Sequence, residues 1–112
     1  MYSRLDRIGE WAILAPQAEF NSKKLAALCK VSSRQLERYF RRSFQKSPQT
    51  WLNAVRLYEA ARLLHSGASV KETAFHLGFK QVSHFSREFK RHVGIAPNIF
   101  VSLQTDDNVA RG

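Results

Sequence analysis

Hydrophobic residues recur at helical spacing along most of the chain, and the longest run predicts a helix over residues 48–65. Ser47 is a good N-cap and Pro48 a good first helical residue, because proline has no N–H to leave unpaired. Gly67 follows the run and is typical of a helix end, since glycine adopts the left-handed conformation at little cost. The apolar positions of this helix are Leu52, Val55 and Leu63, with Ala54, Ala60 and Ala61 among them.

The segments on either side of this helix repeat one pattern. When one is laid over the other, Leu36 aligns with Phe85, Arg38 with Arg87, Phe40 with Phe89, Pro48 with Pro97 and Trp51 with Phe100. The register shifts by one residue near Lys80, where a turn can absorb it. Inside a helix the same shift would rotate every later residue by about 100°. Two similar helical units joined by a rigid helix are therefore predicted.

Two helices are expected before the first longer flanking helix. The first is expected to end before Pro16, because proline cannot continue the hydrogen-bond ladder. The second covers residues 23–29, with Asn21 or Ser22 as its N-cap. The apolar positions are Leu5, Ile8, Trp11, Ala12 and Ala15 in the first helix, and Leu25, Ala26 and Leu28 in the second.

A turn at residues 30–31 then leads into the longer helix of the first unit. Ser32 and Gln35 form a capping box, in which the serine caps the third helical N–H and the glutamine reaches back. This helix is expected to run to about Phe44. Its inward positions are Leu36, Phe40 and Phe44.

The second unit shows the same order of signals. Ser69 and Glu72 form another capping box, and the helix that follows runs to about Leu77. Gly78 is expected to close it with a positive φ. The longer helix of this unit covers residues 82–92. The inward positions of the two helices are Val70, Ala74, Leu77, Phe85, Phe89 and Val93.

The chain ends with one more predicted helix. Gly94 ends the preceding helix, and Pro97 begins a short last one. Residues 104–112 are polar, so a frayed tail is expected there. The residues expected to pack from the last helix are Ile99, Phe100 and Leu103.

Both longer flanking helices carry a basic face opposite their apolar face. In each helix the three members of this face lie about 140–200° from the first apolar residue. They are Arg34, Arg38 and Arg41 in the first helix, and Ser83, Arg87 and Lys90 in the second. Glu37 falls to one side of the arginine stripe. A basic face that recurs at the same angles favours a contact surface over a face that is merely solvated.

The composition supports a polyanionic partner. The 112 residues carry a formal net charge of +9 at pH 7, with a pI near 10.3, and such a balance most often accompanies nucleic-acid binding. Cys29 is the single cysteine, so no intrachain disulfide can form, as suits a reducing cytoplasm. No apolar run approaches the roughly 18 residues of a membrane span, and no signal peptide is recognised.

Catalytic and metal chemistry find little support. Cys29 is interpreted as a small buried hydrophobe, because no histidine lies nearby in sequence to activate it. No two histidines have the i,i+4 spacing of metal ligands, and there is no glycine-rich phosphate loop or paired carboxylate site. We therefore expect no enzyme activity, no metal and no cofactor. The histidines are His65, His76, His84 and His92.

The second repeat carries a recognisable signature. It consists of Thr73-Ala74, Leu77-Gly78-Phe79, Ser83, Phe85-Ser86-Arg87, Phe89-Lys90, Gly94 and Ala96-Pro97. This pattern resembles the AraC/XylS family of transcription regulators. The first half agrees at Leu25-Ala26, Ser32, Leu36, Arg38, Phe40, Ser47-Pro48, Arg56-Leu57 and Ala60. The chain departs from the family pattern at Lys30 and Gln45, where glycine is usual, and at Val101, where arginine is common.

The resemblance implies an all-α fold of seven helices, with two homeodomain-like helix-turn-helix subdomains joined by a central linking helix. The corresponding ranges are 1–47 for the first subdomain, 48–66 for the linking helix, 67–103 for the second subdomain and 104–112 for the polar tail. It also implies that the helices over 33–44 and 82–92 enter successive major grooves of double-stranded DNA. The expected setting is the bacterial cytoplasm, at the nucleoid, with RNA polymerase as a possible second partner.

The family's contacts carry over by position. The implied base contacts are Arg34, Arg38, Val82, Ser83 and Arg87. Arginine can bond guanine O6 and N7 together, and valine can contact a thymine methyl. The implied phosphate contacts are Lys30, Arg41, Arg42, Lys80, Lys90 and Arg91. The alternative for Arg38 and Arg87 is an ion pair with an acid on a neighbouring helix.

These observations favour a sequence-specific transcription regulator that binds DNA as a monomer, unless a longer chain adds a dimerisation domain. One rival is a basic helical adaptor whose charged face docks an acidic protein. Another is a small hydrolase that uses Cys29. The target site, the genes controlled, the effector and the sign of regulation are not encoded in these patterns.

Overall fold

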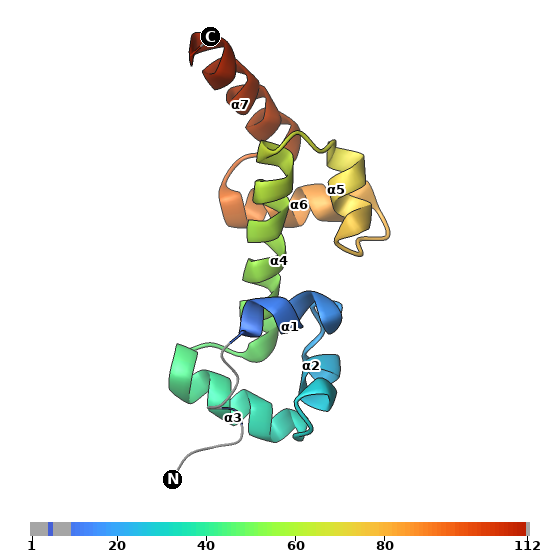
Figure 1. Ribbon diagram of the computed structural model, residues 1–112, viewed down its shortest axis with the longest axis vertical. Coiled ribbons are helices and arrows are strands. Elements are labelled where there is room, and N and C mark those ends of the chain that lie inside the picture. Colours follow the sequence, from blue (N-terminus) through green and yellow to red (C-terminus); the bar gives the residue numbers. More distant parts are fainter. Residues whose placement is uncertain (1–4, 6–9, 112) are drawn as a thin grey trace. The chain divides into compact units, whose positions relative to one another are not determined.

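The computed structural model of the protein describes residue 5 and residues 10–111, so the predicted apolar position Ile8 lies outside the described residues. Within these residues the chain forms seven α-helices and no strand, which confirms the predicted all-α fold (Figure 1). The helices are α1 (Trp11–Gln17), α2 (Ser22–Leu28), α3 (Ser33–Phe44), α4 (Pro48–His65), α5 (Val70–His76), α6 (Val82–Val93) and α7 (Pro97–Arg111).

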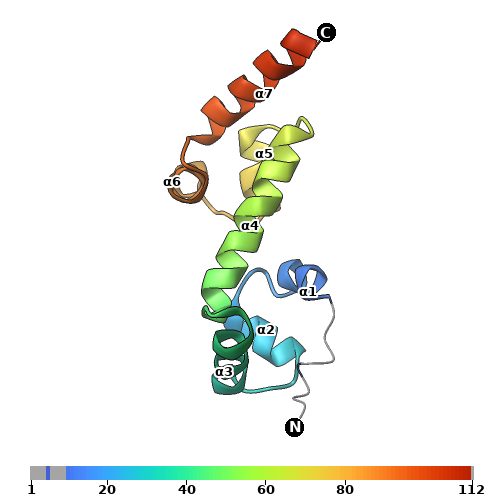
Figure 2. The ribbon, with the colours of Figure 1, turned by 90° about the vertical axis from the view of Figure 1, so that its left-hand side faces the viewer.

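The chain forms two compact units, residues 1–56 and 57–112. Their boundary falls inside α4, which is the long helix at the centre of the sequence. The first unit contains α1–α3 and the start of α4, and the second contains the rest of α4 with α5–α7 (Figures 1 and 2). Each unit is described by itself below.

Side-chain caps define the starts of α3 and α5 as predicted. Ser32 Oγ accepts a bond from the Gln35 N–H (3.1 Å), and Gln35 Oε1 accepts one from the Ser32 N–H (2.8 Å). Ser69 and Glu72 repeat this capping box at 3.0 and 3.4 Å. Each box pairs N–H groups that have no partner inside the helix, which typically stabilises a helix by about 1 kcal/mol. Both longer flanking helices and α4 begin close to their predicted starts.

Five aromatic rings form the core of the first unit. Phe40 of α3 is completely buried. Its ring centroid lies 4.9 Å from those of Trp11 and Phe44 and 5.5 Å from that of Trp51. Tyr39 joins the cluster, with its ring centroid 6.0 Å from that of Trp11. The mostly edge-to-face arrangement suits the quadrupoles of aromatic rings, and it fixes which side of α3 faces inward.

The second unit uses the equivalent positions. Phe85 and Phe89 of α6 are completely buried, with ring centroids 5.7 Å apart. Phe79 lies 5.2 Å from Phe85, and Phe100 of α7 lies 5.5 Å from Phe89. Phe89 and Phe100 are the residues that align with Phe40 and Trp51 in the sequence repeat. Positions that align in the sequence repeat therefore occupy equivalent places in the two cores.

A glutamine on α4 ties α2 into the first unit. Gln49 Oε1 accepts a hydrogen bond from the Ser22 N–H at 3.0 Å. Its Nε2 donates to the Phe20 carbonyl and to Asn53 Oδ1, both at 2.9 Å. Asn21 accepts from the Lys24 N–H at 3.1 Å, which identifies Asn21 as the N-cap of α2. One side chain thus pairs an unmatched donor of α2 with the first turn of α4.

Three helix ends differ from the prediction. α1 begins at Trp11, so Leu5 is buried but lies outside this helix. α1 passes through Pro16 rather than ending before it. The hydrogen bond that proline removes would involve the carbonyl of Ala12, an exposed residue near the start of a short helix, so water can replace it. α7 continues to Arg111, beyond the predicted polar tail boundary, because no glycine or proline lies between Pro97 and Arg111.

Several residues that were predicted to face inward are exposed. In α2, the buried residues Leu25, Cys29 and Ala26 span about 100° of the helix, and Leu28 lies about 60° outside this arc, beyond Leu25. In α7, the buried Pro97 sets the inward side, and the stripe predicted to pack lies largely opposite to it. Val93 has the inward phase but is the last residue of α6. The wrongly assigned residues are Ala12, Leu28, Val93, Ile99 and Leu103.

The buried positions of α4 also differ from the prediction. Leu52 is buried as expected, whereas Val55 and Leu63 are half-buried and Ala54 is exposed. Ala60 is also buried as expected, and the other buried residues of the helix are Pro48, Leu57 and Leu64. Because the two halves of this helix pack in separate cores, a single hydrophobic period does not describe it.

The two units make their turns with different residues. Gly78 and Gly94 have φ values of 84° and 100°, and glycine adopts such values without strain. The aligned residues of the first unit are Lys30 and Gln45, which have φ values of 58° and 57°. A side chain in this left-handed region costs about 1 kcal/mol. The first unit therefore keeps the backbone of the second and accepts the strain.

Replacing Lys30 with glycine is expected to leave the first unit equally stable or more stable. The matched control is Lys30→Ala, which also removes the lysine side chain but keeps a Cβ in the strained conformation. The free energy of unfolding of Lys30→Gly, measured by chemical denaturation, should exceed that of Lys30→Ala by about 1 kcal/mol. A large fall in melting temperature for the glycine variant would contradict this account of the turn.

Candidate nucleic-acid interface

The exposed face of α3 is strongly basic. Leu36, Tyr39 and Phe40 bury the other side of the helix. The arginines lie on the exposed side, as the angular pattern predicted, and both their positions and the cap at Ser32 follow from the sequence. The exposed arginines are Arg34, Arg38, Arg41 and Arg42. α3 therefore presents a rigid row of guanidinium groups to solvent.

The face of α6 repeats this arrangement with fewer arginines. Ser83, Arg87 and Lys90 are exposed, opposite the buried Phe85 and Phe89. Val82, predicted to contact a base, is half-buried in the first turn of the helix. Part of the Val82 side chain is still accessible to solvent, but it is less exposed than Ser83, the next predicted base contact. The second face thus combines one arginine and one lysine with a small and an apolar side chain.

The predicted phosphate contacts surround these faces. Lys30 and Lys80 lie in the turns that precede α3 and α6, and both are exposed. Arg42 and Lys90 are exposed in the last turns of the two helices, with Arg41 and Arg91 beside them. Every predicted site residue except Val82 is therefore exposed, and each lies on or next to the longer helix of its own unit.

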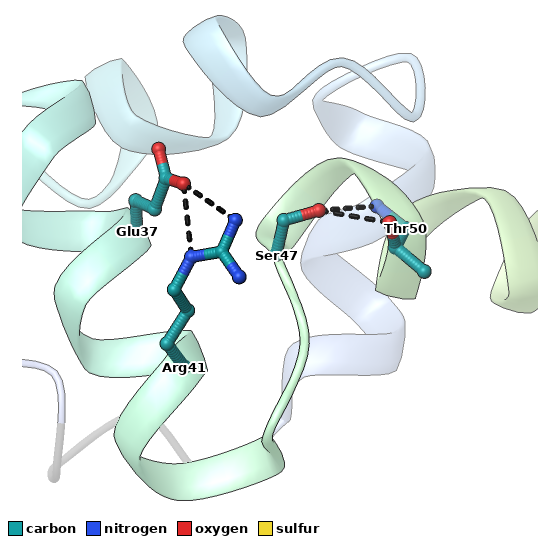
Figure 3. A network of polar contacts seen from close by, with 4 residues as sticks. All are labelled: Glu37, Arg41, Ser47 and Thr50. Atoms are coloured by element: carbon teal, nitrogen blue, oxygen red, sulfur yellow. Dashed lines mark hydrogen bonds and ion pairs between the residues drawn. The ribbon is translucent and has the colours of Figure 1, made fainter.

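Two of these arginines are bound by an acid on their own helix. Glu37 Oε1 accepts bonds from Nε and Nη2 of Arg41, at 3.0 and 2.9 Å (Figure 3). Glu88 Oε2 accepts the same two bonds from Arg91, at 3.0 and 2.9 Å. The angular pattern placed Glu37 to one side of the basic stripe, and its contact with Arg41 was not predicted. The i,i+4 and i,i+3 spacings were the available signal.

Arg38 and Arg87 behave differently. In the part of the chain that the structure describes, neither forms an ion pair with an acid. The alternative in which a neighbouring helix neutralises them is therefore wrong for the described residues. Their guanidinium groups keep all five N–H donors available, which is what two-bond recognition of a guanine edge requires.

The environment of Cys29 does not support the alternative of a hydrolase that uses this thiol as its nucleophile. The Cys29 side chain is a free thiol, 7% exposed, at the end of α2. Burial raises the pKa of this thiol above its ordinary value, so less thiolate is present at neutral pH. A thiol in this state is a poor nucleophile, whereas a small apolar side chain fits the site.

The described residues offer little to other ligands. They contain no group of three or more histidine, cysteine or acidic residues that could hold a metal ion. None of the helices in this part of the chain combines the length and apolar character needed to cross a membrane. A hollow of about 160 Å³ lies between the starts of α2, α3 and α4. Ser47, which lines this hollow, accepts a hydrogen bond at its Oγ from the Thr50 N–H and donates one from the same Oγ to Thr50 Oγ1, at the start of α4 (Figure 3).

Comparison with known proteins identifies relatives over most of the chain. Residues 25–102 match a family model described as a helix-turn-helix domain. The HTH-type transcriptional regulator MtrA of Neisseria gonorrhoeae is 35% identical over 95 residues, which cover 84% of this chain and 32% of that protein. The HTH-type transcriptional activator RhaS of Escherichia coli O157:H7 is 36% identical over 96 residues, covering 85% and 34%. The chain thus spans about a third of the length of these curated relatives.

Solved structures agree with the sequence relatives. A transcriptional regulator from Chromobacterium violaceum, described as an AraC-type DNA-binding domain-containing protein, has a TM-score of 0.75 at 25% identity, covering 90% of this chain and 91% of that one. A probable AraC family transcriptional regulator from Rhodopseudomonas palustris has a TM-score of 0.62 at 31% identity, covering 81% and 93%. Together with the two repeated helix-turn-helix units, these matches show that the chain belongs to the AraC/XylS family of transcription regulators.

Proposed function

We propose that this chain is the DNA-binding part of a bacterial transcription regulator that reads double-stranded DNA with α3 and α6 in successive major grooves. The family relation supports DNA binding and transcription regulation. The finer proposal concerns which residues read bases, and whether both units bind at once. In this proposal, each of the two helix-turn-helix subdomains contributes one base-reading helix, and the linking helix joins them.

One observation carries this proposal. Arg38 and Arg87 occupy equivalent positions in the two repeats, each on the side of its helix opposite a completely buried phenylalanine. Neither has an acidic partner among the described residues. An α-helix fits the major groove, and an exposed arginine on it can bond guanine O6 and N7 together. The repetition of this arrangement supports reading by both units.

The remaining candidates divide by the chemistry they can perform. Arg34, Val82 and Ser83 lie near the starts of α3 and α6, from which recognition helices usually reach the bases. The lysines and arginines in the turns and last helical turns would bond phosphates, which fix register without reading sequence. They are Lys30, Arg41, Arg42, Lys80, Lys90 and Arg91.

The relatives suggest the regulatory setting. RhaS is described as a transcriptional activator, and we extend this sign of regulation to the present chain. Activation would bring a second partner, for which we propose RNA polymerase. The proposed place of action is the bacterial nucleoid, and the proposed binding form of this segment is a monomer, because each chain carries both reading units.

Substituting the two equivalent arginines tests the assignment of base contacts. Arg38→Ala and Arg87→Ala should each cost about 1–3 kcal/mol of binding free energy on the preferred site. Each should also relax sequence preference at a different group of base pairs, separated by about one helical turn. Selection of bound sites from random duplex DNA, followed by titration of the selected site, measures both effects.

The control for this test is Lys90→Ala, which should weaken binding to all sequences alike because phosphates carry no sequence information. If both arginine variants select the same motif as the original protein, the base-contact assignment is wrong. If only Arg87→Ala alters the motif, α6 alone reads the sequence. The proposal that both units bind at once then fails.

Salt dependence tests the number of phosphate contacts. About five to eight contacts predict that log Kobs falls against log salt concentration with a slope of roughly −5 to −7. Lys30→Gly should make that slope shallower by about 0.9, since it removes one phosphate contact. Titrations between low and physiological salt measure the slope. A value shallower than about −2 would contradict engagement of both units.

A further inference from the structure

α3 and α6, the two helices proposed to read bases, each carry a glutamate that pairs with an arginine on the same helix. We propose that Glu37 and Glu88 act as anions that compete with DNA phosphates for Arg41 and Arg91, and so limit the sequence-independent part of DNA binding. This inference rests on the proposed function, because it concerns how α3 and α6 meet DNA. It assigns a function to two carboxylates that the phosphate and base contacts do not use.

The two contacts have the same geometry although they use different spacings. In each, one carboxylate oxygen accepts both the Nε–H and an Nη2–H of the arginine. The spacing is i,i+4 for Glu37 with Arg41 and i,i+3 for Glu88 with Arg91. Glu37 and Glu88 do not align in the sequence repeat. The two glutamates therefore form the same contact from sequence positions that are not equivalent. In each unit, one arginine has its positive charge partly neutralised by the glutamate.

The pairing leaves the proposed base readers untouched. Arg41 and Arg91 belong to the last turns of their helices, where the phosphate contacts are proposed. Arg38 and Arg87 lie one turn earlier and have no ion pair in the described part of the chain. The acids therefore lower the charge available to phosphates and leave both reading arginines available. Such an arrangement would reduce attraction to any duplex without changing the bases that are read.

The two ion pairs are weak enough for a DNA phosphate to displace the carboxylate. The Arg41 and Glu37 side chains are 62% and 51% exposed, and those of Arg91 and Glu88 are 67% and 31% exposed. Exposed pairs of this kind are weak and are screened by salt. A phosphate can therefore displace the carboxylate. The displaced carboxylate then lies close to a like charge, so the gain from the phosphate contact is partly cancelled.

Neutral variants of the two acids test the proposal directly. Glu37→Gln and Glu88→Gln should each steepen the salt slope by up to about 0.9, as one added phosphate contact would. At 0.15 M salt this corresponds to a gain in affinity of up to about fivefold. The gain should appear on the selected site and on an unrelated duplex alike. The selected motif should remain unchanged.

The controls separate local competition from overall charge. Glu59→Gln changes the net charge equally, and Glu59 forms an i,i+3 pair with Arg62 on α4 rather than on a reading helix. In the Arg41→Gln background, adding Glu37→Gln should bring little further gain, because the competed cation is absent. Melting temperatures of all variants are measured alongside.

Each outcome of this experiment decides the matter. Gains for Glu37→Gln and Glu88→Gln that exceed the gain for Glu59→Gln and vanish without the paired arginine support the proposal. Equal effects for all three acids overturn it, since overall charge then explains them. Weaker binding would show that the acids position the arginines, and an altered motif would show that they read bases. If the unaltered chain binds no DNA, the proposed function itself fails, and this inference falls with it.

Discussion

Burial of one phenylalanine at the centre of each unit determines the direction in which the arginines of α3 and α6 point. Phe40 and Phe89 are completely enclosed by other rings, and truncating such a residue usually costs about 3–5 kcal/mol. A helix is rigid about its own axis, so fixing its inward side also fixes its outward side. The arginines need no contacts of their own to be aligned. Their alignment follows from apolar packing on the opposite side of the same helix.

The backbone of the two units is conserved in shape more strictly than in residue type. Lys30 and Gln45 adopt the left-handed conformation that Gly78 and Gly94 adopt in the other half. The shape of the turn is therefore set by the packing of the helices around it, which is strong enough to hold an unfavourable residue there. In the second unit, the local preference of the chain and the requirements of its core agree.

Much of this fold was predictable because it depends on local patterns. The capping residues Ser32 and Ser69 and the buried phenylalanines of α3 and α6 follow from spacing alone, and so does the outward direction of Arg38 and Arg87. The burial of Tyr39 on α3 was not predicted. Gln49 was not predictable, because its partners Ser22 and Phe20 come close only in the folded chain. Leu28 was wrongly placed because its neighbours, rather than its own apolarity, decide which side of a short helix is buried. The contact between Glu37 and Arg41 had a spacing signal, but spacing does not reveal which of several nearby arginines an acid selects.

The position of the unit boundary within α4 bears on how the molecule unfolds. Each core holds only about half of an 18-residue helix, and an isolated helical segment of that length is marginal in water. If one core opens, the α4 residues that it held lose their tertiary support, and the helix must fray toward the other core. Opening of one core thus removes the tertiary support from its half of α4 and leaves the other half packed in its own core.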